Sequence, residues 1–239
     1  MLLQAIAGYD AKDPASANVP VPNFQSEIKN GIKGLRVGVP RAHWFDESHG
    51  IDPQTEAVFD RAIEVLKQLG ASIVEIDGRP FALARKANQT ILVCEAYAYH
   101  EKTYQQTPMK FGSSVRRRML EGAFVSAADY LTAQRARAAL NEQICENFAR
   151  VDVFAVPGAP RPPDAFATLD PDEQNLRPNF TNPFNLTGLP AISVPCGFTA
   201  GTLPVGLQIV APPFEETTAL RAGYAFEQAT EWHRRRPPL

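Results

Sequence analysis

A short polar stretch, residues 182–188, holds the side chains whose types and spacing are most suited to chemistry. Its sequence, NPFNLTG, contains two asparagines and a threonine directly before an apolar run. Amide and hydroxyl groups both donate and accept hydrogen bonds, and loops carried by a rigid scaffold often hold functional residues. We therefore predict a polar loop that forms the mouth of a site, at the point where a buried strand begins.

Two serine patterns that match catalytic motifs have simpler explanations. Ser26 and Lys29 fit Ser-x-x-Lys, which pairs a nucleophile with a base in some hydrolases, but neither Ser-Asp-Asn nor Lys-Thr-Gly accompanies them. A capped surface turn explains this pair. Ser113 and Ser114 follow Gly112 and precede Val115 and three arginines. This second pattern predicts the cap of a helix.

The histidines and cysteines favour neither a catalytic triad nor a metal site. The four histidines are scattered, and no Gly-x-Ser-x-Gly elbow occurs. His43 and His49 are six positions apart in a predicted loop with no cysteine nearby, which is a poor pattern for zinc. Cys196 has no evident catalytic partner, so we predict a core thiol. The sequence therefore predicts no metal and no cofactor.

Composition places the chain among ordinary globular proteins. Its 239 residues, 44% of them hydrophobic, are enough for one sizeable core, and we predict a single domain over residues 1–239, with two closely packed lobes as the alternative. The net charge of −2 gives no reason to expect nucleic acid or an anionic membrane as a partner. Three cysteines without CxxC spacing predict reduced thiols and a cytoplasmic protein.

Hydrophobic periodicity predicts the elements that would carry the polar loop. Asp52 as N-cap, Pro53 in the first turn and Gly70 as a stop bound one helix. Because strands are expected on both sides of it, this unit predicts a parallel pair with a right-handed crossover. Strands alternating with helices indicate the α/β class. The other strands are predicted at 35–40, 72–76 and 152–156, and the helices at 25–29, 81–106, 114–121, 127–150 and 215–232.

The last two predicted strands, 191–194 and 205–210, are the most apolar. The second has few polar atoms on either face, which is typical of a strand covered on both sides. Pro195 and Pro204 are expected at strand ends, where a missing N–H group costs least. Gly197 and Gly201 allow the chain to turn between the strands.

Several motifs together resemble the amidase signature family, serine hydrolases that cleave amide C–N bonds. The run PFNLTGLPAISVPCG, then LPVGLQIVA and the closing FEQATEWHRRRP, resembles the C-terminal half of that family. AIAGYDAKDP, GLRVGVPR and VDVFAVP extend the resemblance over essentially the whole chain. It implies an α/β fold with a mixed central sheet flanked by helices. Residues 1–7 are predicted as the end of a helix stopped by Gly8, and in the family this segment follows the catalytic region, so we expect Met1 to be internal.

The family's mechanism, as the resemblance implies it, uses a nucleophilic Ser, a second Ser in a cis peptide and a Lys that relays the proton. The nucleophile lies in a loop rich in Gly and Ser, and it requires a base because a hydroxyl is a poor nucleophile. No Gly-Gly-Ser-Ser-Gly-Gly-Ser run occurs in this sequence. We therefore assign no catalytic residue, and we predict that the chain alone has no amidase activity.

The resemblance also implies the substrate-binding residues. We predict that Phe184, Asn185 and Thr187 line the substrate pocket. In the tRNA-dependent amidotransferases, whose amidase component belongs to the same family, an Arg in a similar segment holds the substrate carboxylate, a task that suits a guanidinium fork. Arg117 is the candidate here, with Arg118 as the alternative register, and a solvated helix face would explain the same cluster.

Three functional hypotheses follow from these observations. The first is the C-terminal half of an amidohydrolase that acts on a small-molecule amide. The second is a non-catalytic partner, such as half of a split enzyme, a homo-oligomer or a binding module, because the apolar strands would keep an open sheet edge or a hydrophobic patch. The third is a fragment similar to the amidase component of a glutamine-dependent aminoacyl-tRNA amidotransferase, which would co-purify with the other components of that complex.

Overall fold

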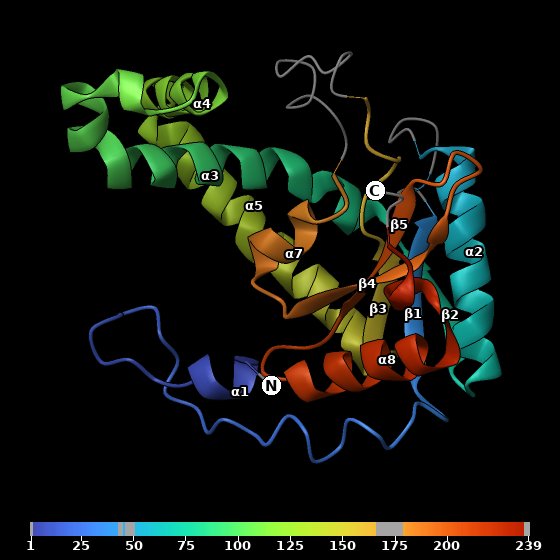
Figure 1. Cartoon of the computed structure of the whole chain (residues 1–239). Coiled ribbons are helices and arrows are strands. Elements are labelled where there is room, and N and C mark those ends of the chain that lie inside the picture. The colour runs from blue at the N-terminus through green and yellow to red at the C-terminus, as the bar shows by residue number, and fades with distance from the viewer. Residues whose placement is uncertain (1, 43–44, 46–50, 166–178, 237–239) are drawn as a thin grey trace.

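The computed structural model describes residues 2–42, 45, 51–165 and 179–236. Its centre is a five-stranded sheet in the order β2-β1-β3-β5-β4 (Figure 1). Strand β1 pairs in parallel with β2 and β3, whereas β5 is antiparallel to both β3 and β4. The predicted mixed sheet is therefore confirmed. The strands are β1 Arg36–Ala42, β2 Ser72–Asp77, β3 Val153–Pro157, β4 Ala191–Phe198 and β5 Pro204–Val210.

Helices α2 (Pro53–Gln68) and α8 (Glu216–Ala229) cover one face of the sheet (Figure 1). Helix α2 begins as predicted: the Asp52 carboxylate accepts hydrogen bonds from the backbone N–H groups of Gln54 and Thr55, at 2.8 and 3.2 Å. These bonds satisfy donors that a helix start leaves without intrahelical partners. Gly70 follows the helix with φ 91°, a conformation that favours glycine.

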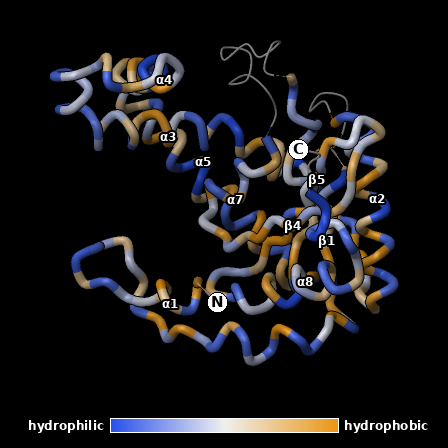
Figure 2. Tube along the Cα trace, in the orientation of Figure 1, coloured by the Kyte–Doolittle hydropathy of each residue, from blue (hydrophilic) through white to orange (hydrophobic). Residues whose placement is uncertain are grey.

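Helices α3 (Arg79–Gln106), α5 (Ala127–Glu146) and α7 (Asn182–Thr187) lie on the opposite side, and α4 (Ser113–Phe124) packs on α3 away from the sheet (Figure 1). Phe154 of β3 joins this side to the sheet, with its ring centroid 5.3 Å from Phe81 and 4.4 Å from Phe148. Hydrophobic stretches follow the strands, while α2 alternates along its length (Figure 2). Burial of these side chains is the main stabilising term.

The remaining helical pieces are short. Helix α1 spans Leu2–Ile6 before Gly8, and 3-10 turns occupy Pro108–Lys110, Asn147–Ala149 and Trp232–Arg234. The helix predicted over 127–150 thus ends at Glu146, and the helix predicted over 215–232 ends at Ala229. Among the described residues, no helix is both long enough and apolar enough to cross a membrane.

Four local predictions were wrong. Residues 182–187 form helix α7 rather than a loop, and residues 25–29 form turns rather than a helix. Pro195 lies inside β4, which continues to Phe198 through an irregular register between Pro195 and Gly197. A proline is tolerated there because β4 is the edge strand, where an N–H group can be dispensed with. Ser113 is the first residue of α4, and Gly112 occupies the cap position without a side-chain hydrogen bond.

Candidate functional site

The candidate site is built around α7, whose ends are set by local sequence. Pro183 lies in the first turn, where a missing N–H group costs nothing, and Gly188 ends the helix in the left-handed conformation with φ 72°. The Gly188 N–H group donates to the Phe184 carbonyl at 2.9 Å. Two contacts then hold α7 in place: Asn88 Nδ2 donates to Asn182 Oδ1 at 3.2 Å, and the buried Gln208 donates to the Phe180 carbonyl at 3.3 Å.

The three predicted pocket residues on α7 have different environments. Phe184 is 2% exposed and packs its ring against Phe154 at 6.5 Å and Phe81 at 6.0 Å, so it belongs to the core beneath the site. Asn185 is exposed, and its amide is accessible to a ligand. Thr187 is half-buried, and its hydroxyl donates to the Pro183 carbonyl at 2.8 Å. Asn185 is thus the most accessible of the three.

Beyond α7, the edge strand β4 presents an accessible face. Its alternate residues Ile192 and Val194 pack toward α8, where a Cβ atom placed at Gly223 would lie 3.3 and 3.4 Å from them. Ala191 and Ser193 point the other way and are exposed. The Ser193 hydroxyl lies over Gly206 of β5, since a Cβ atom at Gly206 would come 2.9 Å from Ser193 Oγ.

Ser193 was not singled out by the sequence reasoning, although a signal for it existed. Strand residues alternate between the two faces of a sheet, so the burial expected for Ile192 and Val194 puts Ser193 on the opposite face. Gly158, after β3, continues the same surface, because a Cβ atom there would lie 3.5 Å from Ser193 Oγ. Small residues leave this part of the sheet open to close approach by another group.

Arg117 is on α4, at the end of α3 that lies away from the sheet, whereas α7 lies beside the sheet (Figure 1). Its Nε atom is 3.7 Å from the Glu121 carboxylate one turn along the same helix. Neighbouring Arg116 donates to the Phe111 carbonyl at 2.8 Å, which fixes the start of α4. The described residues therefore do not bring Arg117 together with the α7 side chains.

The other candidates remain outside any catalytic arrangement. The Ser26 hydroxyl donates to the Asn23 carbonyl at 2.8 Å, as a turn-capping serine does. Burial raises the pKa of the Cys196 thiol to about 12, so the thiolate form is scarce at neutral pH. His43 and His49 lie outside the described residues. Within the described ranges, no cluster of three or more His, Cys, Asp or Glu side chains could hold a metal.

This geometry can bind but holds no assembled catalytic group. Asn185 and the Ser193 hydroxyl can exchange hydrogen bonds with a polar ligand. In the part of the chain that the structure describes, no serine or threonine hydroxyl is paired with a histidine or lysine that could remove its proton. An activated nucleophile requires such a base. The surface therefore has the character of a pocket wall.

Comparison with known proteins gives one consistent result. The family model described as Amidase matches residues 1–220. An amidase from Pseudomonas putida is 36% identical over 251 residues, covering 100% of this chain and 52% of that protein. The chain thus spans about half the length of the curated relatives it matches.

Solved structures agree with the sequence matches. The amidase component of the glutamyl-tRNA(Gln) amidotransferase from Thermotoga maritima superimposes with a TM-score of 0.72 at 30% identity, over 95% of this chain and 49% of that one. A bacterial aryl acylamidase of the amidase signature enzymes gives a TM-score of 0.75 at 20% identity, over 95% and 50%. The second match shows the likeness of fold alone.

Proposed function

This chain belongs to the amidase signature family, and from that premise we propose that it forms the C-terminal portion of an amidohydrolase that cleaves amide C–N bonds. The observation that carries the proposal is the match over residues 1–220. In the working enzyme a serine would attack the amide carbonyl, an amine or ammonia would leave, and water would hydrolyse the acyl-enzyme. The substrate would be a small-molecule amide, and we propose that no cofactor takes part.

We propose that this chain supplies a wall of the pocket and that the Ser, cis-Ser and Lys come from elsewhere. Support comes from the sequence, which lacks the Gly- and Ser-rich run of the family. The accessible surface of Asn185 and Ser193 supports the assignment of a pocket wall. Phe184 would hold α7 against the core, and Thr187 would fix the end of that helix. Arg117 would bind a substrate carboxylate only if α4 is brought over α7 in the working enzyme.

A hydrolysis assay tests this division of roles. The purified chain is incubated with a simple aryl amide and a simple aliphatic amide, and the Pseudomonas putida relative serves as the positive control. We expect no turnover by the chain alone. Measurable turnover that follows the protein through purification would refute the proposal, because the activated serine would then have to lie within these residues.

A second assay examines the remainder of the enzyme. Translation of the DNA upstream of the Met1 codon should continue in frame and encode a Lys and a Gly- and Ser-rich loop. The extended protein should hydrolyse amides. A stop codon close upstream would instead direct attention to a separate partner chain.

The second function that the structure favours is a non-catalytic partner. Strand β4 pairs only with β5 among the described strands, and it is eight residues long. An edge strand of this kind offers unpaired backbone groups to another strand. We propose that a separate catalytic half, or a second copy of this chain, covers this edge. Size-exclusion chromatography should then show association, and a concentration-independent monomer would count against it.

A third possibility is a role similar to that of the amidotransferase component, supported by the 30% identity to the Thermotoga maritima protein. Co-purification with the other components from the native host would distinguish it. We also propose that residues 1–239 form a single domain, since one buried core extends from Ile32 to Phe226. The free thiols of Cys94, Cys145 and Cys196 support a cytoplasmic location.

A further inference from the structure

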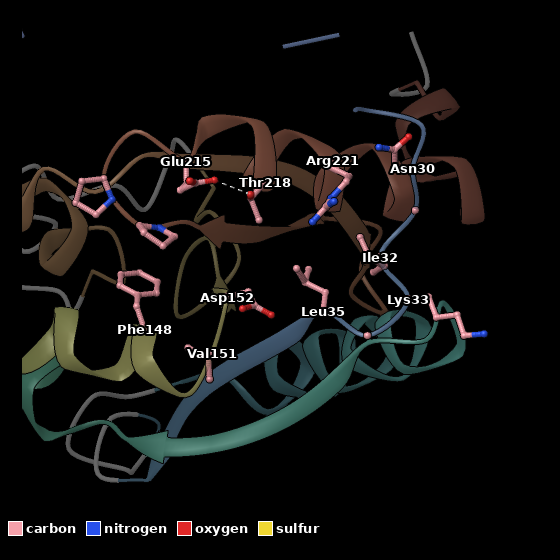
Figure 3. A pocket seen from close by; sticks show the side chains of 14 residues that line it. Asn30, Ile32, Lys33, Leu35, Phe148, Val151, Asp152, Glu215, Thr218 and Arg221 are labelled. Atoms are coloured by element: carbon pink, nitrogen blue, oxygen red, sulfur yellow. Dashed lines mark hydrogen bonds between the residues drawn. The ribbon is translucent and has the colours of Figure 1, made fainter. Parts of the chain in front are cut away.

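A second cavity lies between the start of α8 and the loop that leads into β1. It has a volume of about 710 Å³, and no residue of α7 or β4 lines it. Figure 3 shows Arg221 reaching from α8 into the space above Leu35 and Asp152, with Phe148 and Val151 on the far wall. This cavity is therefore separate from the candidate pocket wall, and it combines one cationic side chain with apolar surfaces.

Arg221 is the polar group in this cavity that lacks a partner. Its Nε atom is buried, and it has no hydrogen-bond partner among the described residues. A buried donor of this kind is costly unless something accepts from it. The guanidinium is planar and presents its donors as a fork that matches a carboxylate. Arg221 therefore needs an acceptor that the described chain does not supply.

Asp152 is the nearest candidate for that acceptor, but it is occupied. Its Oδ1 atom accepts from Arg36 Nη2 at 2.6 Å, and its Oδ2 atom accepts from the Arg36 backbone N–H group at 2.7 Å. Glu215 accepts a hydrogen bond from the Thr218 hydroxyl at 3.0 Å, at the opposite end of the cavity from Lys33 (Figure 3). Arg36 compensates the charge of Asp152, so the positive charge of Arg221 remains available to a ligand.

The remaining walls define which anion would fit. Phe148, Val151 and Leu35 line one side, and Pro212 and Pro213 line the other. These surfaces favour a ligand with an apolar body. A dianion such as phosphate would face repulsion from the two nearby carboxylates with a single guanidinium in compensation. A monoanion with one carboxylate and an apolar group meets both the charge and the walls.

We propose that this cavity is a second ligand site, in which Arg221 binds the carboxylate of a small organic acid and the apolar walls bind its hydrocarbon body. The site does not depend on amide hydrolysis, and it lies apart from the surface that we assign to the substrate pocket. Asn30 and Thr218 border the same space and can donate further hydrogen bonds to the carboxylate.

Calorimetric titration of the purified chain tests the proposal with benzoate, in a buffer low in chloride. We expect saturable binding of one benzoate per chain. Benzamide has the same shape without the charge, and it should bind at least about tenfold more weakly because a charge-assisted hydrogen bond is lost. This comparison requires no substitution, so it tests the proposal even if a variant does not fold.

Two variants locate the site. Arg221→Gln should weaken benzoate binding at least about tenfold. Arg135→Gln changes an exposed arginine of α5 outside the cavity, and it should leave the affinity within about twofold of the original. Circular dichroism establishes that each variant is folded. The proposal is overturned by a lack of saturable benzoate binding, by equal affinity for benzamide, by an unaffected folded Arg221→Gln variant, or by tighter binding of inorganic phosphate.

Discussion

Arg36 and Asp152 bind each other through both main chain and side chain, across 116 residues of sequence. The Arg36 backbone N–H group donates to Asp152 Oδ2 at 2.7 Å, its Nη2 group donates to Oδ1 at 2.6 Å, and the Asp152 N–H group donates to the Arg36 carbonyl at 2.8 Å. The pair joins the first residue of β1 to the residue before β3. It therefore fixes the start of the parallel pairing at the centre of the sheet.

This pair predicts how stability depends on pH. The hydrogen bond from Arg36 is the largest cause that lowers the pKa of Asp152. A lowered pKa in the folded state stabilises the fold above the unfolded value of about 3.9, and this contribution is lost as pH falls through the folded pKa. Asp152→Asn should lower the melting temperature at pH 7 and flatten its fall below about pH 4. An unchanged melting curve across that range would contradict this assignment, and Asp13→Asn, which changes an exposed loop carboxylate, provides the control.

Close packing between α3 and α4 predicts a stability loss for Gly122→Ala. A Cβ atom at Gly122 would lie 2.1 Å from the Val93 carbonyl oxygen and 2.8 Å from its carbon, and backbone atoms cannot move aside easily. Overpacking of this kind typically costs about 1–3 kcal/mol. Urea denaturation should show a reduced free energy of unfolding. Gly201→Ala, in an exposed turn where the nearest atom is 3.9 Å away, should change it by less than about 0.5 kcal/mol.

The thiols should differ in their reactivity. Burial raises the pKa of Cys196 to about 12, so at pH 8 very little thiolate is present and the side chain is also shielded. Cys94 and Cys145 are only half-buried. A variant with Cys94→Ala and Cys145→Ala should therefore react negligibly with a chromogenic disulfide reagent in the native state and release one equivalent in guanidinium. Rapid native reaction would show that Cys196 is accessible.

Neighbouring residues of α7 should separate core from surface. Phe184→Ala removes a ring that is 2% exposed and should cost about 3–5 kcal/mol in free energy of unfolding. Asn185→Ala removes an exposed amide and should change stability by less than about 0.5 kcal/mol. In an amidase that contains this chain, the second substitution should raise KM. Equal stability losses for both variants would argue that Asn185 is structural rather than part of a pocket wall.

Local signals explain which parts of the fold could be predicted from sequence. Helix α2 carries its own start and stop, Asp52, Pro53 and Gly70, and these act within one or two turns. Helix α7 carried similar signals in Pro183 and Gly188, but six residues are too few for a helical period to appear. Pro195 was placed at a strand end because sequence alone does not say which strand forms the edge of the sheet.

The candidate site was partly predictable for the same reason. Asn185 and Thr187 are adjacent to a recognisable strand, so their neighbourhood followed from the chain. The relation of Ser193 to Gly206 depends on the antiparallel register of β4 and β5, and that of Arg221 to Asp152 depends on how α8 packs on the sheet. Distant pairings of this kind are decided by tertiary packing, which single-sequence patterns do not contain.

The strand order also determines when the sheet can form during synthesis. Strands β1 and β2 are complete once residue 77 has left the ribosome, but β1 obtains its second neighbour only when β3 emerges, after α3, α4 and α5. Contacts between distant residues form slowly because a long loop must close first. The growing chain therefore carries an apolar strand with one open edge through the synthesis of three helices, so chaperone binding to nascent chains that end between residues 77 and 153 should exceed binding to the completed sheet.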